Sequence, residues 1–254
     1  MTAAATTTPM GPRGHLMEGV LVRNCWASAG AVHGILSADW SACGITGSVT
    51  SIPSVFRDIL GAEMHPEALT SQLGQEWSLS SGYHKIYACC QHGHASIEAL
   101  LTMLDSAEGA PLIEDIESID IYTFPLALSL NNVSPTTTLG AKFSLPHMVA
   151  ATLVYKTGGA RAFYQDTLTD TVVEKLRNKI NLHPFGQPLI PPNDRPSRVV
   201  VKTYDGTRYE RECLSAQGGP DRPFSHEVIL NKIRDISATD LPGLVRLADG
   251  FDMT

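Results

Sequence analysis

The sequence predicts an α+β fold on the strength of three local patterns in a chain of 254 residues. Residues 119–123 alternate apolar and polar side chains, as a strand with one buried face does. Two strand-like runs between residues 199 and 213 flank Asp205-Gly206, which is typical of a hairpin with a tight turn. The apolar residues of 97–104 recur at i, i+3, i+4 and i+7, the spacing of one helical face. Helices combined with an antiparallel hairpin indicate the α+β class.

The N-terminal elements are expected to be helical. Residues 20–41 are rich in Ala, Gly and Ser with larger apolar residues interspersed, which favours a helix packed closely against others. The turn sequence of residues 44–47 (Gly-Ile-Thr-Gly) ends this helix, and residues 55–60 are predicted to form a second, short one.

Helix-start and helix-stop signals mark the middle of the chain. Ser144 is the predicted N-cap of a helix with Pro146 in its first turn, where the missing N–H costs nothing. Gly158-Gly159 is expected to end that helix. Residues 171–174 match a capping box, which predicts a further helix that includes Leu176 and Ile180.

The last predicted element is a helix that follows the hairpin. Ser225 is its expected N-cap, and Ile229, Ile233 and Ile236 fall on one face. We expect this apolar face, and the apolar face of residues 20–60, to pack against helices that this chain does not encode. A monomer would then expose apolar surface, which predicts self-association or binding to another chain.

Composition excludes several classes of protein. A net charge of −7 argues against a nucleic-acid surface, so a small molecule is the expected partner. Five cysteines without a small-scaffold spacing argue against a disulfide framework and favour a reducing compartment. No signal peptide or membrane-spanning run is recognisable, so we expect an intracellular protein, cytoplasmic or mitochondrial, without a membrane association. No phosphate loop, dinucleotide fingerprint or iron–sulfur cysteine set is present, so we expect no cofactor.

Titratable groups are concentrated in one short run, residues 83–94. It holds Lys85, three histidines and two adjacent cysteines, which offers an anion contact, a general base and a general acid within a dozen positions. Histidines near a helix start also serve as capping or surface residues, and both interpretations stay open. His92 and His94 have no second ligand pair with finger-like spacing, so no metal site is expected.

Four stretches in order resemble one family. They are the Lys-x-Tyr-x-Cys-Cys-x-His-x-His pattern from Lys85, the residues 34–47, the run Lys142 to His147 followed by Val-Ala-Ala, and residues 218–225 with Lys232 downstream. This pattern resembles the MmgE/PrpD family, which includes 2-methylcitrate dehydratases and cis-aconitate decarboxylases. The resemblance covers nearly all of this chain but only the C-terminal half of a usual member.

The resemblance implies a domain arrangement. Residues 13–82 would be part of a helical domain, residues 83–215 a smaller, lid-like α+β domain, and residues 216–254 a segment that returns to the helical domain. Residues 1–12 are a Thr/Ala-rich leader that we expect to be disordered. The family's N-terminal helical region, which supplies acidic and histidine site groups, has no counterpart here.

The resemblance also implies the site residues. Lys85 stands at the position of a catalytic lysine, and His147 at that of a site tyrosine, with His84 beside Lys85 as a further catalytic candidate. Arg23 stands where relatives often carry a lysine and suits carboxylate binding. His92 and Cys90 are further candidates for substrate binding. The ordinary alternatives are a solvated lysine, a surface salt bridge for Arg23 and buried structural thiols. Lys232 is interpreted as structural, with its stem along the core.

Two functions of different classes are open at this stage. The first is a cofactor-independent lyase, a dehydratase that removes a proton beside a carboxylate of 2-methylcitrate or a similar tricarboxylic acid and expels water. A cis-aconitate decarboxylase activity is a weaker variant, because relatives of that type can carry histidine at the position of Cys90. The second is a truncated, non-catalytic homologue that assembles with a full-length enzyme.

Overall fold

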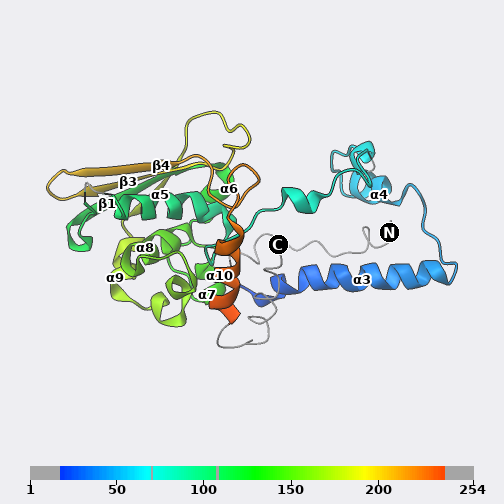
Figure 1. Cartoon of the computed structure of the whole chain (residues 1–254), viewed down its shortest axis with the longest axis horizontal. Coiled ribbons are helices and arrows are strands. Elements are labelled where there is room, and N and C mark those ends of the chain that lie inside the picture. Colours follow the sequence, from blue (N-terminus) through cyan, green and yellow to red (C-terminus); the bar gives the residue numbers. More distant parts are fainter. Residues whose placement is uncertain (1–17, 70, 107–108, 238–254) are drawn as a thin grey trace. The chain divides into compact units, whose positions relative to one another are not determined.

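A computed structural model describes residues 18–69, 71–106 and 109–237 of the chain. The chain divides into two units, Met1–Ser80 and Ser81–Thr254. Figure 1 shows the elements of both units, coloured along the sequence. The leader predicted for residues 1–12 and the end of the segment 216–254 lie outside the described residues. The predicted α+β class is confirmed, whereas the predicted domain borders stay predictions.

The first unit is helical. It contains the 3-10 turn η1 (Leu21–Asn24), α3 (Cys25–Ala42), α4 (Ser51–Pro53), the π-helical turn η2 (Ser54–Ile59), and the 3-10 turns η3 (Pro66–Leu69) and η4 (Ser78–Ser81), the last of which ends at the border. Gly44 ends α3 as expected, with φ at +83°, and the N–H of Ile45 donates to the Trp40 carbonyl at 2.9 Å. Both predicted helical regions are therefore present.

The apolar side chains of α3 are largely exposed. Ile35 is 66% and Trp40 is 44% exposed, and Val32 and Leu36 are exposed as well. Within the part of this helix whose side chains the structure describes, the buried residue is the small Ser37. The helix thus presents more apolar surface than a stable isolated element usually does.

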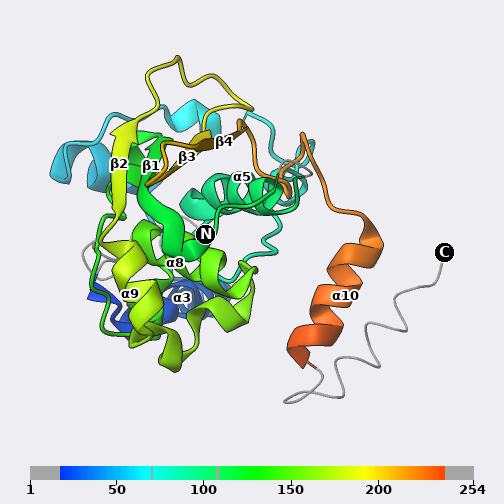
Figure 2. The ribbon, with the colours of Figure 1, turned by 90° about the vertical axis from the view of Figure 1, so that its left-hand side faces the viewer.

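The second unit contains a four-stranded sheet with the order β2-β1-β3-β4 (Figure 2). The strands are β1 (Ile116–Thr123), β2 (Ile180–Pro184), β3 (Ser197–Thr203) and β4 (Arg208–Cys213). β2 runs parallel to β1, and β3 pairs antiparallel with both β1 and β4. The predicted strand and hairpin are confirmed, and the hairpin turn has Gly206 at φ +87°.

Helices cover one face of this sheet in two layers. α5 (His94–Leu104) lies against the sheet, with α8 (Leu145–Tyr155) and α9 (Thr171–Arg177) beyond it (Figure 1). The shorter elements are α6 (Pro125–Leu128), α7 (Thr138–Ala141), η5 (Gln91–Gly93), η6 (Ile113–Asp115), η7 (Ala160–Phe163) and η8 (Gln165–Leu168). The core between the layers is built from fully buried apolar side chains, including Ile97, Leu100, Met103, Ile119, Ile121, Met148 and Leu153.

Local signals predicted some helix boundaries and missed others. Ser144 caps α8 as expected, since its hydroxyl accepts the His147 N–H at 3.0 Å. The same helix ends earlier than predicted, because Lys156 adopts the left-handed conformation at φ 55° before Gly158-Gly159 is reached. That glycine pair has a different role, described below.

The helix predicted from the capping box at residues 171–174 needs two corrections. Its N-cap is Asp170, whose carboxylate accepts the N–H groups of Val172 and Val173 at 2.8 and 3.2 Å. It also stops at Arg177, because Ile180 belongs to β2 and lies opposite Ile119 of β1. Tertiary pairing with the buried face of the sheet overrides the helical pattern there.

The final helix, α10 (His226–Ser237), begins as predicted, and the Val228 N–H reaches the Ser225 hydroxyl at 3.4 Å. Its predicted apolar face is only partly covered. Ile229 and Ile233 are half-buried, and Ile236 is 62% exposed. Leu230 is the apolar residue that α10 buries.

The outer face of the sheet is organised around one carboxylate. Asp120, 8% exposed on β1, accepts hydrogen bonds from Lys202 at 2.9 Å, His183 at 3.0 Å and Asn181 at 3.3 Å. The His183 ring also stacks on Tyr122 at 4.9 Å. Burial raises the pKa of Asp120, but the three hydrogen bonds outweigh it and hold the pKa below its ordinary value.

Asp120→Asn should therefore lower the free energy of unfolding at pH 7 by about 1–2 kcal/mol, since three donors lose a charged acceptor. Because the folded-state pKa is depressed, this contribution is present above the ordinary aspartate pKa of 3.8 and is lost as pH falls through the lower folded value. Urea denaturation at pH 7 and pH 3 measures it. Glu117→Gln, at an exposed site of the same strand, is the matched control. Equal stability of Asp120→Asn and wild type at pH 7 would contradict this assignment.

Candidate functional site

The residues Tyr83–Cys90, called the lysine segment below, contain Lys85 and form neither helix nor strand. Three backbone hydrogen bonds tie it to distant parts of the second unit. The N–H of His84 donates to the carbonyl of Gly218 at 2.9 Å, that of Ala88 to Gly158 at 2.9 Å and that of Cys90 to Lys142 at 2.8 Å. The segment is thus held by tertiary contacts and leads directly into η5 and α5.

Two glycines allow the closest of these approaches. Gly218 has φ +119°, and a Cβ placed on it would overlap the carbonyl oxygen of His84. A Cβ on Gly158 would lie 2.6 Å from Tyr87 and 2.7 Å from Ile97. Gly158-Gly159 and Gly218-Gly219 are visible in the sequence as turn signals, but their role in holding the lysine segment required the fold.

His94 supports the segment from beneath. It is fully buried at the start of α5, and the rings of Tyr83 and Tyr87 meet it edge-on, with centroids 5.8 and 5.0 Å away. Burial, and then the positive charge of Lys85, lower the pKa of His94 to about 4. The imidazole is therefore neutral at pH 7 and packs against the two tyrosine rings.

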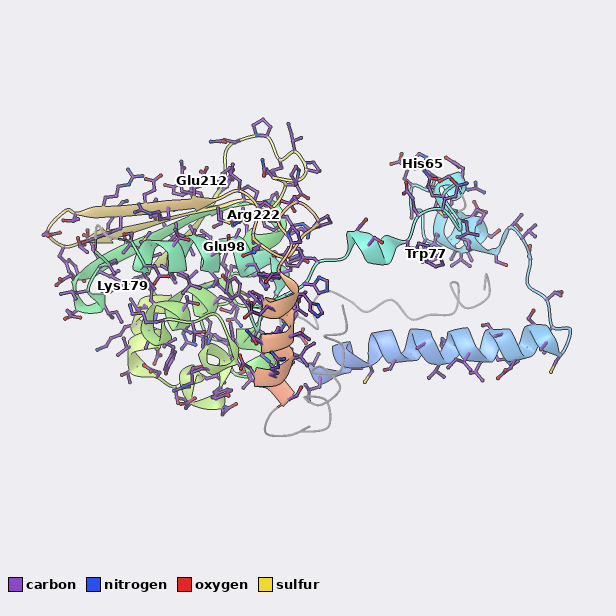
Figure 3. The ribbon with its side chains drawn as sticks, viewed as in Figure 1. His65, Trp77, Glu98, Lys179, Glu212 and Arg222 are labelled. Atoms are coloured by element: carbon purple, nitrogen blue, oxygen red, sulfur yellow. The ribbon has the colours of Figure 1, made fainter. Side chains whose placement is uncertain are left out.

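The loop after the hairpin joins the segment to α5. Arg222 forms an ion pair with Glu98 of α5 at 2.8 Å (Figure 3). The other oxygen of Glu98 accepts the Gln217 N–H at 2.8 Å, and the Tyr83 hydroxyl donates to the Gln217 carbonyl at 2.8 Å. The sequence did not point to Glu98 and Arg222, because Arg222 lies 124 positions from Glu98, and Gln217 lies 119 positions from it, so no local pattern reveals these contacts.

Lys85 is not neutralised within the described part of the chain. Its ammonium group donates to the Cys89 carbonyl at 3.4 Å, and no ion pair with a carboxylate involves it. Burial dominates the environment of the Cys89 thiol and raises its pKa, against the opposing charges of Lys85 and Lys142. The thiol is therefore protonated at pH 7, which suits a structural role.

The structure brings some of the other sequence-predicted residues to this place. His84 is exposed next to Lys85, and Cys90 is half-buried at the end of the segment. His92 follows in η5, with its ring edge-on to Phe124 at 5.3 Å. These three candidates therefore lie on or next to the lysine segment, because they are close to Lys85 in the sequence.

His147 has a different environment. It is fully buried in α8, with Nε2 3.1 Å from the Ala162 carbonyl and Nδ1 3.4 Å from the Arg177 guanidinium. Burial lowers the pKa of His147 to about 4. Both ring nitrogens are occupied within the core, and no contact in the described residues joins the ring to the lysine segment. Its catalytic assignment stays a prediction.

Arg23 belongs to η1 in the first unit, and its side chain lies outside the described residues. Its predicted role in carboxylate binding stays a prediction. Among the described residues, no group of three or more His, Cys, Asp or Glu side chains is placed to hold a metal ion. None of the described helices combines the length and apolar character needed to cross a membrane.

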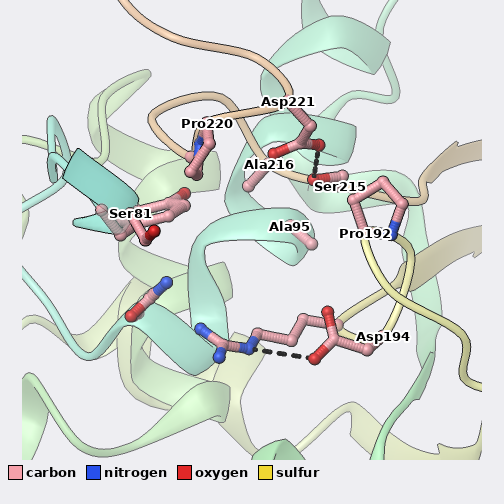
Figure 4. Close-up of a pocket in the computed structure, with 12 residues that line it drawn as sticks. Ser81, Ala95, Pro192, Asp194, Ser215, Ala216, Pro220 and Asp221 are labelled. Atoms are coloured by element: carbon pink, nitrogen blue, oxygen red, sulfur yellow. Dashed lines mark hydrogen bonds and ion pairs between the residues drawn. The ribbon is translucent and has the colours of Figure 1, made fainter. Parts of the chain in front are cut away.

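A pocket of about 200 Å³ lies beside the lysine segment (Figure 4). Tyr83, Gln91 and Ala95 line one part of it, with Asp194 and Arg195 from the loop before β3. The loop after the hairpin contributes further lining residues, among them Ser215, Ala216, Gly219, Pro220 and Asp221. Arg195 is paired with Asp194 at 3.6 Å, and Asp221 accepts the Ser215 hydroxyl at 2.6 Å. The pocket can admit a small polar molecule next to the segment that carries Lys85.

Comparison with known proteins relates most of the second unit to one family. The model of the MmgE/PrpD C-terminal domain matches residues 87–243. The chain is also similar to the cis-aconitate decarboxylase-like protein oryM of Aspergillus oryzae, with 24% identity over 181 residues that cover 68% of this chain. The matched part spans only 37% of that relative's length.

Gly218→Ala should lower the free energy of unfolding by about 1–3 kcal/mol, because a side chain at this φ is strained and would push on the His84 carbonyl. Thermal unfolding followed by circular dichroism measures the loss. Gly34→Ala in α3 is the control, since a Cβ there meets nothing within 4 Å. Equal effects of the two substitutions would contradict the close approach of Gly218 to the lysine segment.

His147→Gln tests the buried imidazole of α8. The folded pKa of about 4 lies below the ordinary 6.5, so the unfolded state binds protons first as pH falls between these values. Wild-type stability should therefore decline over this window by roughly 1–3 kcal/mol through this group, and the stability difference between wild type and His147→Gln should shrink. Urea denaturation at pH 7, 5.5 and 4.5 measures the difference; a constant value would contradict burial of a neutral imidazole.

Proposed function

Because the chain belongs to the MmgE/PrpD family, we propose that it is a lyase of the dehydratase type that acts on a citrate-like tricarboxylic acid such as 2-methylcitrate. The observation that carries the proposal is the exposed Lys85, whose segment is tied down by three backbone hydrogen bonds and which has no carboxylate partner among the described residues. A carboxylate substrate supplies the missing negative charge.

The reaction first requires a cation that neutralises the negative charge of the substrate, and only then a base. Removing a proton from the carbon beside a carboxylate places additional negative charge on an anion, so a fixed cation lowers the barrier by stabilising that charge. The anchoring of its segment at three backbone positions supports Lys85 in this role. We assign His92 and Cys90 to substrate contacts around it, and Arg23 to a further carboxylate.

Proton transfer is assigned to Lys85 and His84 as alternatives. Lys85 in its ammonium form supplies the cation and leaves the base to His84, whereas Lys85 acting as the base becomes the cation as it accepts the proton. A neutral amine or imidazole accepts the proton from the carbon beside the carboxylate, the electron pair forms the new carbon–carbon double bond, and the hydroxyl on the neighbouring carbon leaves. The leaving hydroxyl takes up a proton and departs as water. His147 is retained as a third catalytic candidate, although its core contacts support an indirect role.

Decarboxylation is a second candidate, favoured by the name of the Aspergillus relative. The two reactions differ in their products. Dehydration leaves all carboxylates in place, whereas decarboxylation of an unsaturated tricarboxylate releases one equivalent of carbon dioxide. Assay of carbon dioxide with cis-aconitate as the substrate therefore distinguishes them.

A non-catalytic role in an assembly is a third candidate, and the exposed apolar side chains of α3 support it. For either role, we propose that the chain associates with a second copy or with another chain that covers this helix. Under the lyase assignment, that partner also completes the site. Sedimentation velocity tests the association. A species larger than the monomer is expected, and a compact monomer would contradict the association. An intracellular location, cytoplasmic or mitochondrial, stays part of the proposal.

The direct test is ultraviolet detection of the unsaturated product from 2-methylcitrate or citrate, with the purified chain at a concentration where it is associated. Lys85→Met should reduce the rate by about 10²-fold or more, since it removes both the cation and the proposed base. Lys85→Arg keeps the charge but cannot accept a proton, so it separates the two roles.

Lys175→Met is the matched control, because Lys175 is an exposed lysine on α9 that the proposal gives no role. It should retain full activity. Undiminished product formation by Lys85→Met would contradict the assignment of Lys85. No product from folded, associated wild-type protein would instead favour the assembly role.

A further inference from the structure

A second lysine lies at the lysine segment, contributed by a helix far along the chain. Lys232 of α10 donates a hydrogen bond from its ammonium group to the carbonyl of Lys85, 147 positions away. The ammonium group of Lys85 itself turns to the carbonyl of Cys89. α10 thus places one cation directly against the backbone of the residue that carries the other.

Neither ammonium group is neutralised by a carboxylate in the described part of the chain. Glu227 and Asp235 are the acidic residues of α10, and neither forms an ion pair with Lys232. Other cations of this unit do have such partners, since Arg222 pairs with Glu98 at 2.8 Å and Lys202 with Asp120 at 2.9 Å. Lys85 and Lys232, in contrast, contact backbone carbonyl oxygens in the described residues and keep their net positive charge.

The two lysines act on each other and on the same buried ring. Burial lowers the pKa of Lys232, and the charge of Lys85 lowers it further. Both lysines also contribute to the lowered pKa of His94, after the larger effect of burial. The Lys232 ammonium group lies against the backbone of Lys85, and the two like charges repel each other. A bound anion would relieve that repulsion.

We propose that Lys85 and Lys232 form a single anion site, which binds two carboxylate groups of the same ligand. The choice of a polycarboxylate as ligand rests on the proposed function, whereas the site itself rests on the contacts above. Lys232 is then a substrate-binding residue in this proposal, in place of the structural role that the sequence suggested. A ligand with one carboxylate satisfies only one of the two ammonium groups and should bind less tightly.

Tricarballylate is the probe, because it carries three carboxylates but no hydroxyl group and so cannot be dehydrated. The full chain is labelled with ¹⁵N and ¹³C in its lysine side chains, and the resonances of Lys85 and Lys232 are identified from Lys→Arg variants. Both resonances should shift during the titration and give one dissociation constant. Butyrate, with a single carboxylate, serves as the comparison ligand.

Lys232→Met should weaken tricarballylate binding about tenfold or more and change butyrate binding far less, which corresponds to the loss of one ion pair in a shared site. Lys232→Arg should retain most of the affinity, and this rescue excludes simple misfolding. Lys175→Met is again the matched control. Wild-type affinity of Lys232→Met for tricarballylate, or a shift of the Lys85 resonance alone, would overturn the proposal.

The outcomes separate this proposal from the lyase assignment. If both lysines respond to tricarballylate and no substrate is converted, the anion site stands and the lyase assignment fails. If substrate is converted with Lys85 dependence but Lys232→Met changes neither binding nor rate, the lyase assignment stands and the paired site fails. If neither lysine responds, the paired site fails whatever the assay of activity gives.

Discussion

The candidate site depends on one constraint. The lysine segment is neither a helix nor a strand, so it has no regular backbone hydrogen bonds of its own to hold it in place. Buried or half-buried backbone groups need partners, and the lysine segment finds them at Gly158, Lys142 and Gly218. Two of these three partners are glycines, and a side chain at either position would collide with neighbouring atoms. The position of Lys85 therefore follows from close backbone packing, and its side chain is left available for a ligand.

The rest of the second unit supports this constraint. The sheet and α5 form a core of fully buried apolar residues, and α5 begins with His94 beneath the segment. The loop that contains Gly218 is attached to α5 at Glu98. This residue pairs with Arg222 and accepts the hydrogen bond of the Gln217 N–H. A polar loop is thus attached to a rigid helix at several points, which limits its movement when charge develops nearby.

Local chemistry in the sequence predicted those features that local interactions determine. The cap at Ser144, the Asp-Gly hairpin and the face of α5 all appear in the structure because neighbours in sequence create them. β2 was missed because Ile180 continues an apolar pattern that only pairing with β1 resolves as a strand. The run around Lys85 was recognisable as a site, whereas Gly158, Gly218 and Lys232 required contacts across large sequence separations. His147, at the position of a site tyrosine in the family pattern, is a fully buried residue of α8, and its catalytic assignment stays a prediction.

We propose that the lysine segment presents cations and a base to a carbon–hydrogen bond beside a carboxylate of the substrate. Hydrogen exchange at that bond measures it most directly, because exchange needs proton abstraction but not the loss of water. Citrate incubated with the chain in heavy water should lose its methylene proton resonances in the nuclear magnetic resonance spectrum. Lys85→Met should leave those resonances intact. Resonances that persist with folded wild-type protein, at the same rate as without protein, would contradict the claim.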